Sequence, residues 1–457
     1  MKRKFATLVI ILMTTPLLLF SQQKVWSLEE CIGHALQNNI QIKQQEIATQ
    51  YQSSALELSK LSLLPTLNGS ASHNYSFGRA LDETTYQFTD NQTIQSNNFN
   101  AGSNVTLFRG MVNYNTIKRN QYQLLASEQD LEGFKDDISL NVALGYLQIL
   151  LNRELVTATS AQVELTKQQI VRTGKLVDAG SLARGNLLDI EAQAAREELQ
   201  LVNLQNQLTM SYLALAQMLE LPAVDDFEIA VPALSIDPVA VEGDPSGIFS
   251  IAEKTRPEIL SAQYKLKGAE YDFAIAKGGR SPRLSLGMSV GTAYSDNRVN
   301  PITLEPYSFR NQLNDNLNYG VGFSLNIPIF NGWQVNTNIR NSKLGIENSE
   351  YTLEATRKQL FKNIQQAFTD ANGALNKYFA SKKAVESMEE AFRYAEQKMK
   401  EGMVTAVEYN QSKTQLLNAQ SEMAQAKYEY VFKTKVLDFY KGIPLTLQHI
   451  TILSNKF

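Results

Sequence analysis

Cysteine and histidine carry out much of the nucleophilic and metal chemistry of proteins, and this chain has few of either. Cys31 is the only cysteine in 457 residues, so no internal disulfide can form. His34, His73 and His449 are too scattered to have metal-ligand spacing. The chain also has no Gly-rich phosphate loop and no serine elbow. We therefore predict no catalytic residue, no metal site, no cofactor and no enzyme activity, and we expect Cys31 to be a packed helix residue rather than a nucleophile or a lipid anchor.

The composition indicates a folded, exported protein. Hydrophobic residues make up 43% of the chain and charged residues 19%, against roughly 25% charged residues in soluble domains. The net charge of -3 provides no basic excess for nucleic-acid binding. Residues 1–22 start with basic residues and continue as a short apolar run that contains Pro16 and ends near Ser21. This pattern predicts a secretory signal peptide, and we expect no transmembrane helix in the mature chain.

Two long windows without proline predict long helices. All twelve prolines lie outside residues 66–221 and 329–443. Proline inside a helix costs about 3 kcal/mol, so windows of this length favour uninterrupted helix. Apolar residues recur there at steps of three and four, as an amphipathic helix requires. In the first half of the chain we expect helices over residues 28–62, 111–178 and 183–220.

The two halves of the chain are copies of each other. A shift of 222 positions aligns Gly110 with Gly332, and a shift of 217 positions aligns Pro65 with Pro282 further upstream. Such self-similarity indicates an internal duplication. Each repeat is expected to contain a helix, a strand, a loop, a strand, a long helix, a turn and a helix. The predicted segments are a signal peptide (1–22), repeat one (23–221), an equatorial linker (222–246), repeat two (247–443) and a C-terminal segment (444–457).

The expected strands alternate between large apolar and small polar residues. Strands of about ten residues with this alternation are typical of a membrane barrel around a wet lumen. A soluble sandwich sheet also alternates, but it does not require such long joined helices. The connecting segments, 78–98 and 295–316, are long and polar and suit the outer surface. The residues expected to face lipid are Leu284, Leu286, Met288, Val290, Val321, Phe323, Leu325 and Ile327.

Four strands are too few to close a membrane barrel, because open edges are not tolerated in lipid and about eight strands are the minimum. Several chains must therefore share one barrel. Two chains give eight strands with little lumen, and three give twelve. The predicted fold is mainly α, with a long-helix α-barrel continuous with a transmembrane β-barrel. Gly110 and Gly332 are expected to allow the bend at each strand-helix join, with Pro328 near a strand end.

Several of these features together resemble the TolC-type family of outer-membrane efflux channels. They are the duplicated order of elements, the repeated Phe-x-Gly joins, the Leu-Pro-x-Leu strand opening at residues 64–67 and the glycine-centred turns. The resemblance covers nearly the whole mature chain. It implies a homotrimer in the outer membrane of a Gram-negative bacterium, with a twelve-helix tunnel crossing the periplasm. It further implies docking to a periplasmic adaptor protein and an inner-membrane pump.

The resemblance also assigns roles to the two helical turns, which in the family meet the adaptor. The docking candidates are Gly180, Ser181, Leu182, Ala183, Gly402, Met403, Val404 and Thr405. In the family, an acidic residue six positions past the glycine narrows the periplasmic entrance. The matching gate candidates are Glu408 and Asn186, followed three positions later by Gln411 and Asp189. Gln411 replaces a second family acid, and Val404 stands where some members place an arginine, so the resemblance does not extend to the closed-state lock.

The function expected from these features is a passive exit duct for small molecules driven by a pump. An exit duct for secreted proteins is the alternative within the same class, because the tunnel wall does not record its cargo. A coiled-coil surface stalk is the alternative from another class. A stalk should show sustained heptads and a single anchor, whereas this chain has duplicated strand pairs with alternating polar faces. The expected partners are further copies of the chain, the adaptor, the pump and outer-membrane lipid.

Overall fold

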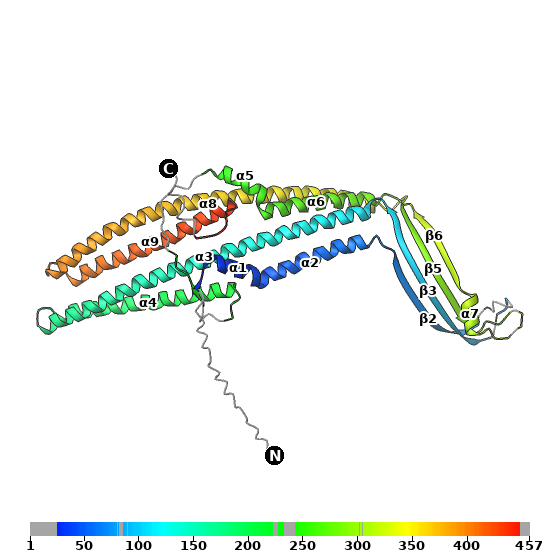
Figure 1. The fold of residues 1–457 in the computed structure, drawn as a ribbon, viewed down its shortest axis with the longest axis horizontal. Coiled ribbons are helices and arrows are strands. Elements are labelled where there is room, and N and C mark those ends of the chain that lie inside the picture. Colours follow the sequence, from blue (N-terminus) through cyan, green and yellow to red (C-terminus); the bar gives the residue numbers. More distant parts are fainter. Residues whose placement is uncertain are drawn as a thin grey trace, which may run out of the picture.

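The computed structural model describes residues 25–79, 81, 86–88, 90–222, 227–232, 243–300, 302–303 and 305–447. The predicted signal peptide and most of the C-terminal segment lie outside these residues. The molecule is elongated: long helices form a rod, and one sheet lies at an angle to the rod at one end (Figure 1). The helices of the two halves run side by side along the rod.

The two halves have the same order of elements. The first half contains α1 (Leu28–Asn38), α2 (Ile40–Leu61), β2 (Thr66–Gly78), β3 (Gln92–Arg109), α3 (Val112–Asp178) and α4 (Arg184–Met218). The second contains α5 (Pro245–Thr255), α6 (Pro257–Gly278), β5 (Arg283–Ser295), β6 (Asn318–Asn326), α8 (Gln334–Lys400) and α9 (Ala406–Tyr440). Both long helices have 67 residues and both helices that follow them have 35. The predicted fold class and the internal duplication are confirmed.

The long helices α3 and α8 are uninterrupted because neither contains a proline. At about 1.5 Å per residue, a helix of this length spans about 100 Å. Among the helices that the structure describes, none is apolar enough over a sufficient length to cross a bilayer.

The prediction of one helix over residues 28–62 was wrong, because the backbone breaks at Asn39. Asn39 has φ -59° and ψ 126° and ends α1. Its side chain then caps α2 by accepting hydrogen bonds from the backbone N–H groups of Gln41 (2.9 Å) and Ile42 (3.3 Å). Its amide nitrogen donates to the carbonyl of Met218 at 3.1 Å, which ties the break to the end of α4. In the second half, the backbone breaks at the matching place, Arg256, which makes no side-chain cap and is followed by Pro257 as the first residue of α6.

The main core lies halfway along the rod, where α1, α3 and α4 meet the end of α9. Cys31 is fully buried there, which confirms that it is a packed helix residue. A short parallel pair joins β1 (Val25–Trp26) to β4 (Glu228–Ile229) beside this core. The hydroxyl of Tyr146 donates to the carbonyl of Ala230 at 2.6 Å and so fixes the linker onto α3. Val25–Trp26 and residues 228–230 are thereby held at the middle of the rod.

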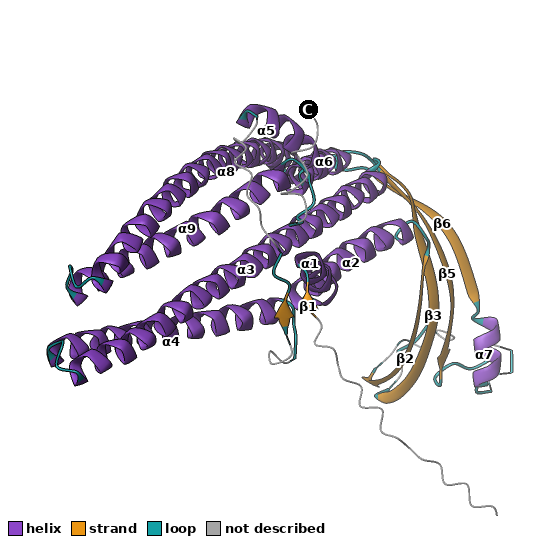
Figure 2. Ribbon diagram, turned by 60° about the vertical axis from the view of Figure 1, so that its left-hand side comes forward, coloured by secondary structure: helices purple, strands orange, loops and turns teal. Residues whose placement is uncertain are grey.

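The main sheet is antiparallel, in the order β2-β3-β5-β6, and it is curved (Figure 2). In the part of the chain that the structure describes, β2 and β6 each have one neighbouring strand, so each leaves one edge open. The strand β3 starts at Gln92, so residues 92–98 are strand rather than the predicted loop. The second strand of repeat two ends at Asn326, and Pro328 follows two residues later. The two middle strands come from different halves, which makes the sheet a joint product of both repeats.

A short helix, α7 (Phe309–Asp315), lies within the predicted second loop and covers the outer end of β5. Gln312 is fully buried and its side-chain amide acts like a neighbouring strand. It accepts from the N–H of Ser295 at 3.0 Å and donates to the carbonyl of the same residue at 2.8 Å. Because β6 pairs with β5 only as far as Gly291, α7 satisfies the part of the β5 edge that β6 does not reach.

Candidate functional site

The two predicted turns are the tips of helical hairpins, and each is built on a glycine. Gly180 and Gly402 have φ of +74° and +71°, a backbone conformation that favours glycine. After α3, the N–H of Ser181 donates to the carbonyl of Leu176 at 2.9 Å. After α8, the N–H of Met403 donates to the carbonyl of Lys398 at 2.8 Å. Both hydrogen bonds close the left-handed helix ending known as a Schellman motif, so the two tips share one backbone design.

The two turns lie close enough to enclose one cavity of about 420 Å³. Its lining includes six of the predicted residues: Ser181, Leu182, Asn186, Gly402, Val404 and Thr405. Leu176, Ile190 and Met399 add apolar surface to it, and Arg172 and Lys400 add two cationic side chains, which the sequence did not single out. The other predicted residues lie outside the lining, and among them Met403 is 73% exposed. The structure thus joins the two turns into one small, mixed surface at the tip of the rod.

The gate candidate Glu408 is engaged in capping α9. Its carboxylate accepts a hydrogen bond from the N–H of Thr405 at 3.1 Å, and the hydroxyl of Thr405 accepts one from the N–H of Glu408 at 3.2 Å. This reciprocal pair is a capping box, in which an acidic side chain satisfies a free N–H at the helix start. The matching helix α4 begins after Ala183, which makes no side-chain cap. The gate roles of Glu408, Asn186, Asp189 and Gln411 stay predictions.

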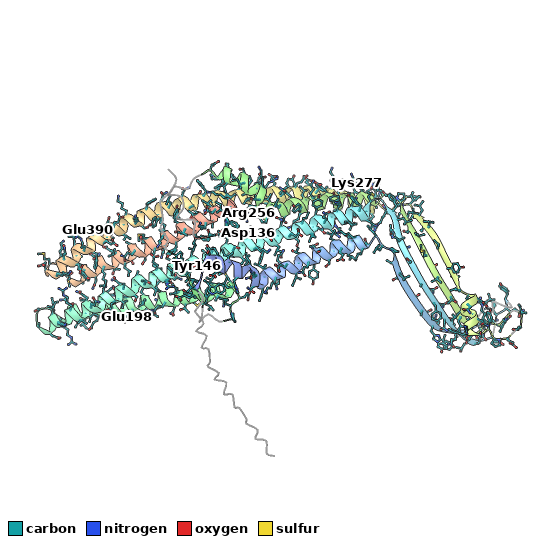
Figure 3. All side chains as sticks on the ribbon, in the orientation of Figure 1. Asp136, Tyr146, Glu198, Arg256, Lys277 and Glu390 are labelled. Atoms are coloured by element: carbon teal, nitrogen blue, oxygen red, sulfur yellow. The ribbon has the colours of Figure 1, made fainter. Side chains whose placement is uncertain are left out.

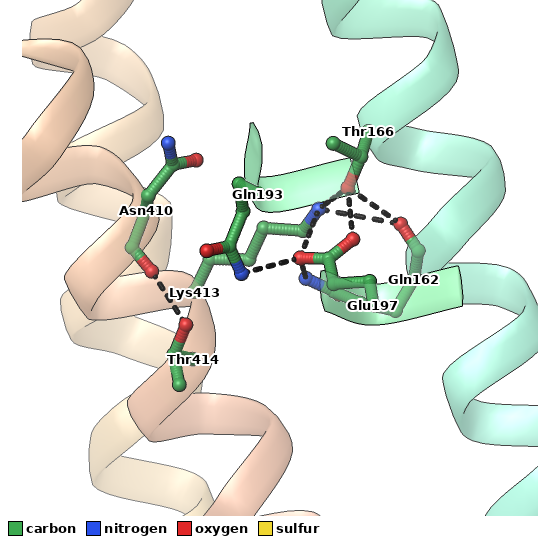
Figure 4. A network of polar contacts seen from close by, with 7 residues as sticks. All are labelled: Gln162, Thr166, Gln193, Glu197, Asn410, Lys413 and Thr414. Carbon is green, nitrogen blue, oxygen red and sulfur yellow. Dashed lines mark hydrogen bonds and ion pairs between the residues drawn. The ribbon is translucent and has the colours of Figure 1, made fainter. Parts of the chain in front are cut away.

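A buried polar network holds the two hairpins together above the tips (Figure 4). Lys413 of α9 and Glu197 of α4 are only 3% and 4% exposed, and their Nζ and Oε1 atoms are 3.6 Å apart. Thr166 of α3 donates to Glu197 and accepts from Lys413. Gln162 and Gln193 each donate to Glu197, at 3.3 and 3.0 Å. Burial lowers the pKa of Lys413, and the nearby carboxylate opposes this shift.

The sequence reasoning missed this network because its members are far apart in the chain and come from three helices. One signal was available. Lys413 stands four residues after Tyr409 and four before the buried Leu417, in line with an apolar stripe. A lysine at a core-facing helix position is unusual and needs a partner.

A second charged cluster lies halfway along the rod (Figure 3). Arg256 is 9% exposed and its Nη2 atom is 3.1 Å from a carboxylate oxygen of Asp136. Its guanidinium also stacks over the ring of Phe439, 4.0 Å from the centroid. Burial raises the pKa of Asp136, and this effect outweighs the attraction of the guanidinium. The cluster places a carboxyl group that resists ionisation between the two halves.

At each strand-helix join, where the sequence analysis expected a glycine to allow a bend, two consecutive residues have a left-handed backbone. Gly110 and Met111 have φ of +54° and +61°, and Gly332 and Trp333 have +59° and +62°. The joins differ in packing. A methyl group on Gly110 would come within 2.4 Å of Ser281 Cβ, whereas nothing lies within 4 Å of the same position on Gly332. Gly110 is therefore required for close packing as well as for the bend.

The register brings the predicted lipid-facing residues onto one face. Leu284, Leu286, Met288 and Val290 pair directly with Leu325, Phe323, Val321 and Tyr319. The side chains of β6 are largely exposed in the single chain, with Phe323 72% exposed, whereas Leu284 and Leu286 of β5 are half-buried. Ile327 lies just beyond the end of β6. Strands β5 and β6 thus present an apolar row on one face, which on β3 also includes polar residues such as Ser103 and Asn97. The contact of this face with lipid stays a prediction.

Comparison with known proteins agrees with this architecture. The family model described as "Outer membrane efflux protein" matches residues 31–220 and 248–439, one match in each half. Outer membrane protein TolC of Escherichia coli K12 is 24% identical over 81% of this chain and 72% of its own length. The proteases secretion protein PrtF of Dickeya chrysanthemi is 22% identical over 87% of this chain and 84% of its own.

The solved structures show the same fold. The outer membrane protein VceC of Vibrio cholerae superposes with a TM-score of 0.75 over 91% of this chain and 96% of its own, at 16% identity. The described architecture has a mainly helical body, a four-stranded sheet and two similar halves, and the family match covers both halves. The chain therefore belongs to the outer membrane efflux protein family, the channel proteins of the bacterial outer membrane whose helices form a periplasmic tunnel.

Proposed function

We propose that three copies of this chain form the exit duct of a tripartite efflux system, through which small molecules leave the cell passively once a pump has delivered them. An adaptor protein in the periplasm would join the duct to a pump in the inner membrane. The observation that carries this proposal is the four-stranded sheet, which has two open edges and a row of apolar side chains on one face of β5 and β6.

The open edges favour a shared barrel. Each unpaired backbone N–H or C=O group in hydrocarbon costs several kcal/mol, so a membrane sheet must close on itself. Four strands leave no room for closure within one chain, whereas a third copy brings the total to twelve strands and opens a wet lumen. The edges of β2 and β6 are the surfaces that would pair between neighbouring copies.

The helical tips support docking to a helical partner. The cavity between the turns is lined by Leu182 and Val404, with small or polar neighbours that allow close approach. An adaptor helix is the kind of partner that inserts apolar side chains into such a surface. We accordingly propose the residues of the two turns, 180–183 and 402–405, as the docking surface. We also propose that the repeat boundaries predicted from the sequence are the limits of the two structural halves.

The duct and its docking can be tested separately. Purified protein should run as a heat-labile trimer and conduct ions in planar bilayers. In a background with Cys31→Ser, a cysteine-specific crosslinker placed at Leu182→Cys or Val404→Cys should recover a periplasmic partner. A matched cysteine at the exposed Lys358 of α8, far from the tips, should not recover that partner. A monomer that does not conduct would overturn the duct, and conduction without any crosslinked partner would overturn the docking surface alone.

The similarity to PrtF favours a second candidate, an exit duct for secreted proteins. The same trimer would serve, so the distinction lies in the cargo. Deletion of the gene should sensitise the cell to small toxic compounds if the duct exports small molecules. It should instead retain a protein inside the cell, with unchanged drug sensitivity, if the duct exports proteins.

A further inference from the structure

The four strands of the main sheet contain few charged groups. Within β2, β3, β5 and β6 as the structure describes them, the lysine, arginine, aspartate and glutamate residues amount to Arg109 and Arg283. The polar face around them is made of small neutral side chains such as Asn68, Ser72 and Asn104. Any fixed charge on this face is therefore due to these two arginines.

The two arginines lie directly opposite each other. The register pairs Arg109 of β3 with Arg283 of β5, and such pairs have Cβ atoms about 4.5–5.5 Å apart. Both side chains are exposed in the single chain. The guanidinium of Arg283 donates to the hydroxyl of Thr106 at 3.2 Å, which places it on the polar face. Like charges in this position destabilise a sheet, so the pair calls for an explanation other than stability.

A β-bulge brings this pair about. Along β3, odd-numbered residues such as Phe99 and Val105 lie on the apolar face, and Arg109 would follow them in a regular strand. The register shifts between Thr106 and Phe108, which leaves Leu107 as the extra residue. Phe108 consequently pairs with Leu284 on the apolar face, and Arg109 turns to the polar face. Bulges commonly redirect a side chain in this way.

We infer that Arg109 and Arg283 form a basic girdle that attracts anionic solutes at the inner end of the barrel, where β3 passes into α3. The inference rests on the proposed trimeric duct, in which three pairs bring six guanidinium groups to one level of the lumen. Fixed charges lining a pore raise the local concentration of ions of opposite sign. The neutral wall beyond the girdle leaves the arginines unopposed along the barrel. The ligand class is small anions and molecules that carry an anionic group.

The test uses the full-length protein in planar bilayers with a KCl gradient. Removal of both charges in Arg109→Gln/Arg283→Gln should lower the chloride-to-potassium permeability ratio roughly threefold at about 0.1 M salt. The shift should shrink towards 1 M salt, because the screening length falls from about 10 Å to about 3 Å. The charge-preserving Arg109→Lys/Arg283→Lys should restore the wild-type ratio. Each single variant to glutamine should give about half the effect. These single variants provide the test if the double variant does not insert into the bilayer.

A matched control removes one arginine at the opposite end of the sheet. Arg310→Gln in α7, which is exposed, should shift the ratio less than either single girdle variant. An equal shift from Arg310→Gln, or an unchanged ratio in conducting double-variant channels, would overturn the girdle and leave the duct standing. Wild-type protein that forms no channel would instead overturn the duct itself. A merely structural role is contradicted if the glutamine variants keep trimers that are as heat-resistant as the wild type.

Discussion

At the scale of single residues, Glu408 combines a helix cap with a proposed charge at the entrance, and two substitutions distinguish these roles. Its carboxylate caps α9, and in a symmetric trimer three copies would also form an anionic ring. Glutamine can replace glutamate in a capping box, because its carbonyl oxygen still accepts the hydrogen bond from the N–H of Thr405. Alanine removes both the cap and the charge.

We predict that Glu408→Gln keeps the thermal stability of the trimer and lowers its cation preference, whereas Glu408→Ala also destabilises the start of α9 by about 1 kcal/mol. Reversal potentials measure the first property and thermal unfolding measures the second. The sign of the permeability change is opposite to that expected for the girdle variants. Unchanged reversal potential in both variants would reduce Glu408 to a helix cap.

Asp136 provides a prediction for pH. Its pKa is raised in the folded protein, chiefly by burial, so the folded state binds a proton more tightly than the unfolded state. A raised pKa contributes stability that is fully present below the unfolded value, near 3.8, and is lost as pH rises through the folded value. The wild type should therefore gain stability relative to Asp136→Asn as the pH falls from neutrality towards 4.

Thermal midpoints of the two proteins, measured across this range, test the sign. If the wild type instead loses stability relative to the variant on acidification, the ion pair with Arg256 dominates over burial. Asp137→Asn is a suitable control, because burial also raises the pKa of Asp137, whereas the aspartate that pairs with Arg256 in the described part of the chain is its neighbour Asp136.

At the scale of elements, the two strand-helix joins form a natural matched pair. Both glycines have a positive φ, so alanine costs about 1–2 kcal/mol at either position. Gly110 lies against the turn before β5, where an added methyl group meets Ser281 and the carbonyl of Gly278 at 2.7 Å or less. Overpacking of this kind typically adds about 1–3 kcal/mol.

We predict that Gly110→Ala lowers the temperature of trimer dissociation clearly more than Gly332→Ala does. Heating series followed by gel electrophoresis give both temperatures under one set of conditions. Equal losses would mean that the turn before β5 moves aside easily and that backbone conformation alone selects glycine at the joins.

The elements that the sequence predicted well are those with a long, regular signal. The absence of proline and the apolar periodicity were enough for the 67-residue helices, and the duplication located both joins. The break at Arg256 has a local cause, because Pro257 follows it and starts α6. The break at Asn39 was missed because it depends on a tertiary contact, the hydrogen bond from Asn39 to the carbonyl of Met218. The bulge after Thr106 was missed for a similar reason, since it exists only relative to the partner strand. The helix α7 is short, and its buried Gln312 has no periodic signal.

At the scale of the whole molecule, the buried pair of Lys413 and Glu197 connects the two halves near the tips. Removal of one member leaves a buried charge without its partner, which costs about 3–5 kcal/mol. Replacement of both by apolar residues of similar size is often neutral or stabilising. Comparing the single and double replacements of this pair therefore shows whether the site requires charged side chains or only side chains of the right size.

We predict that Lys413→Met is strongly destabilising and that Lys413→Met/Glu197→Leu recovers much of the loss. Thermal unfolding followed by helical circular dichroism completes the double-mutant cycle, with the exposed i,i+4 pair of Glu354 and Lys358 as a control of small effect. Additive losses would show that the two side chains act independently.

The open edges of β2 and β6 also have a consequence before any duct exists. Exposed strand edges are templates for indiscriminate pairing, so a newly exported chain is prone to aggregate in the periplasm. Productive encounter of three copies depends steeply on their concentration, whereas misassembly needs only two. Assembly of the trimer therefore competes kinetically with aggregation, and the monomer must associate and insert before it aggregates.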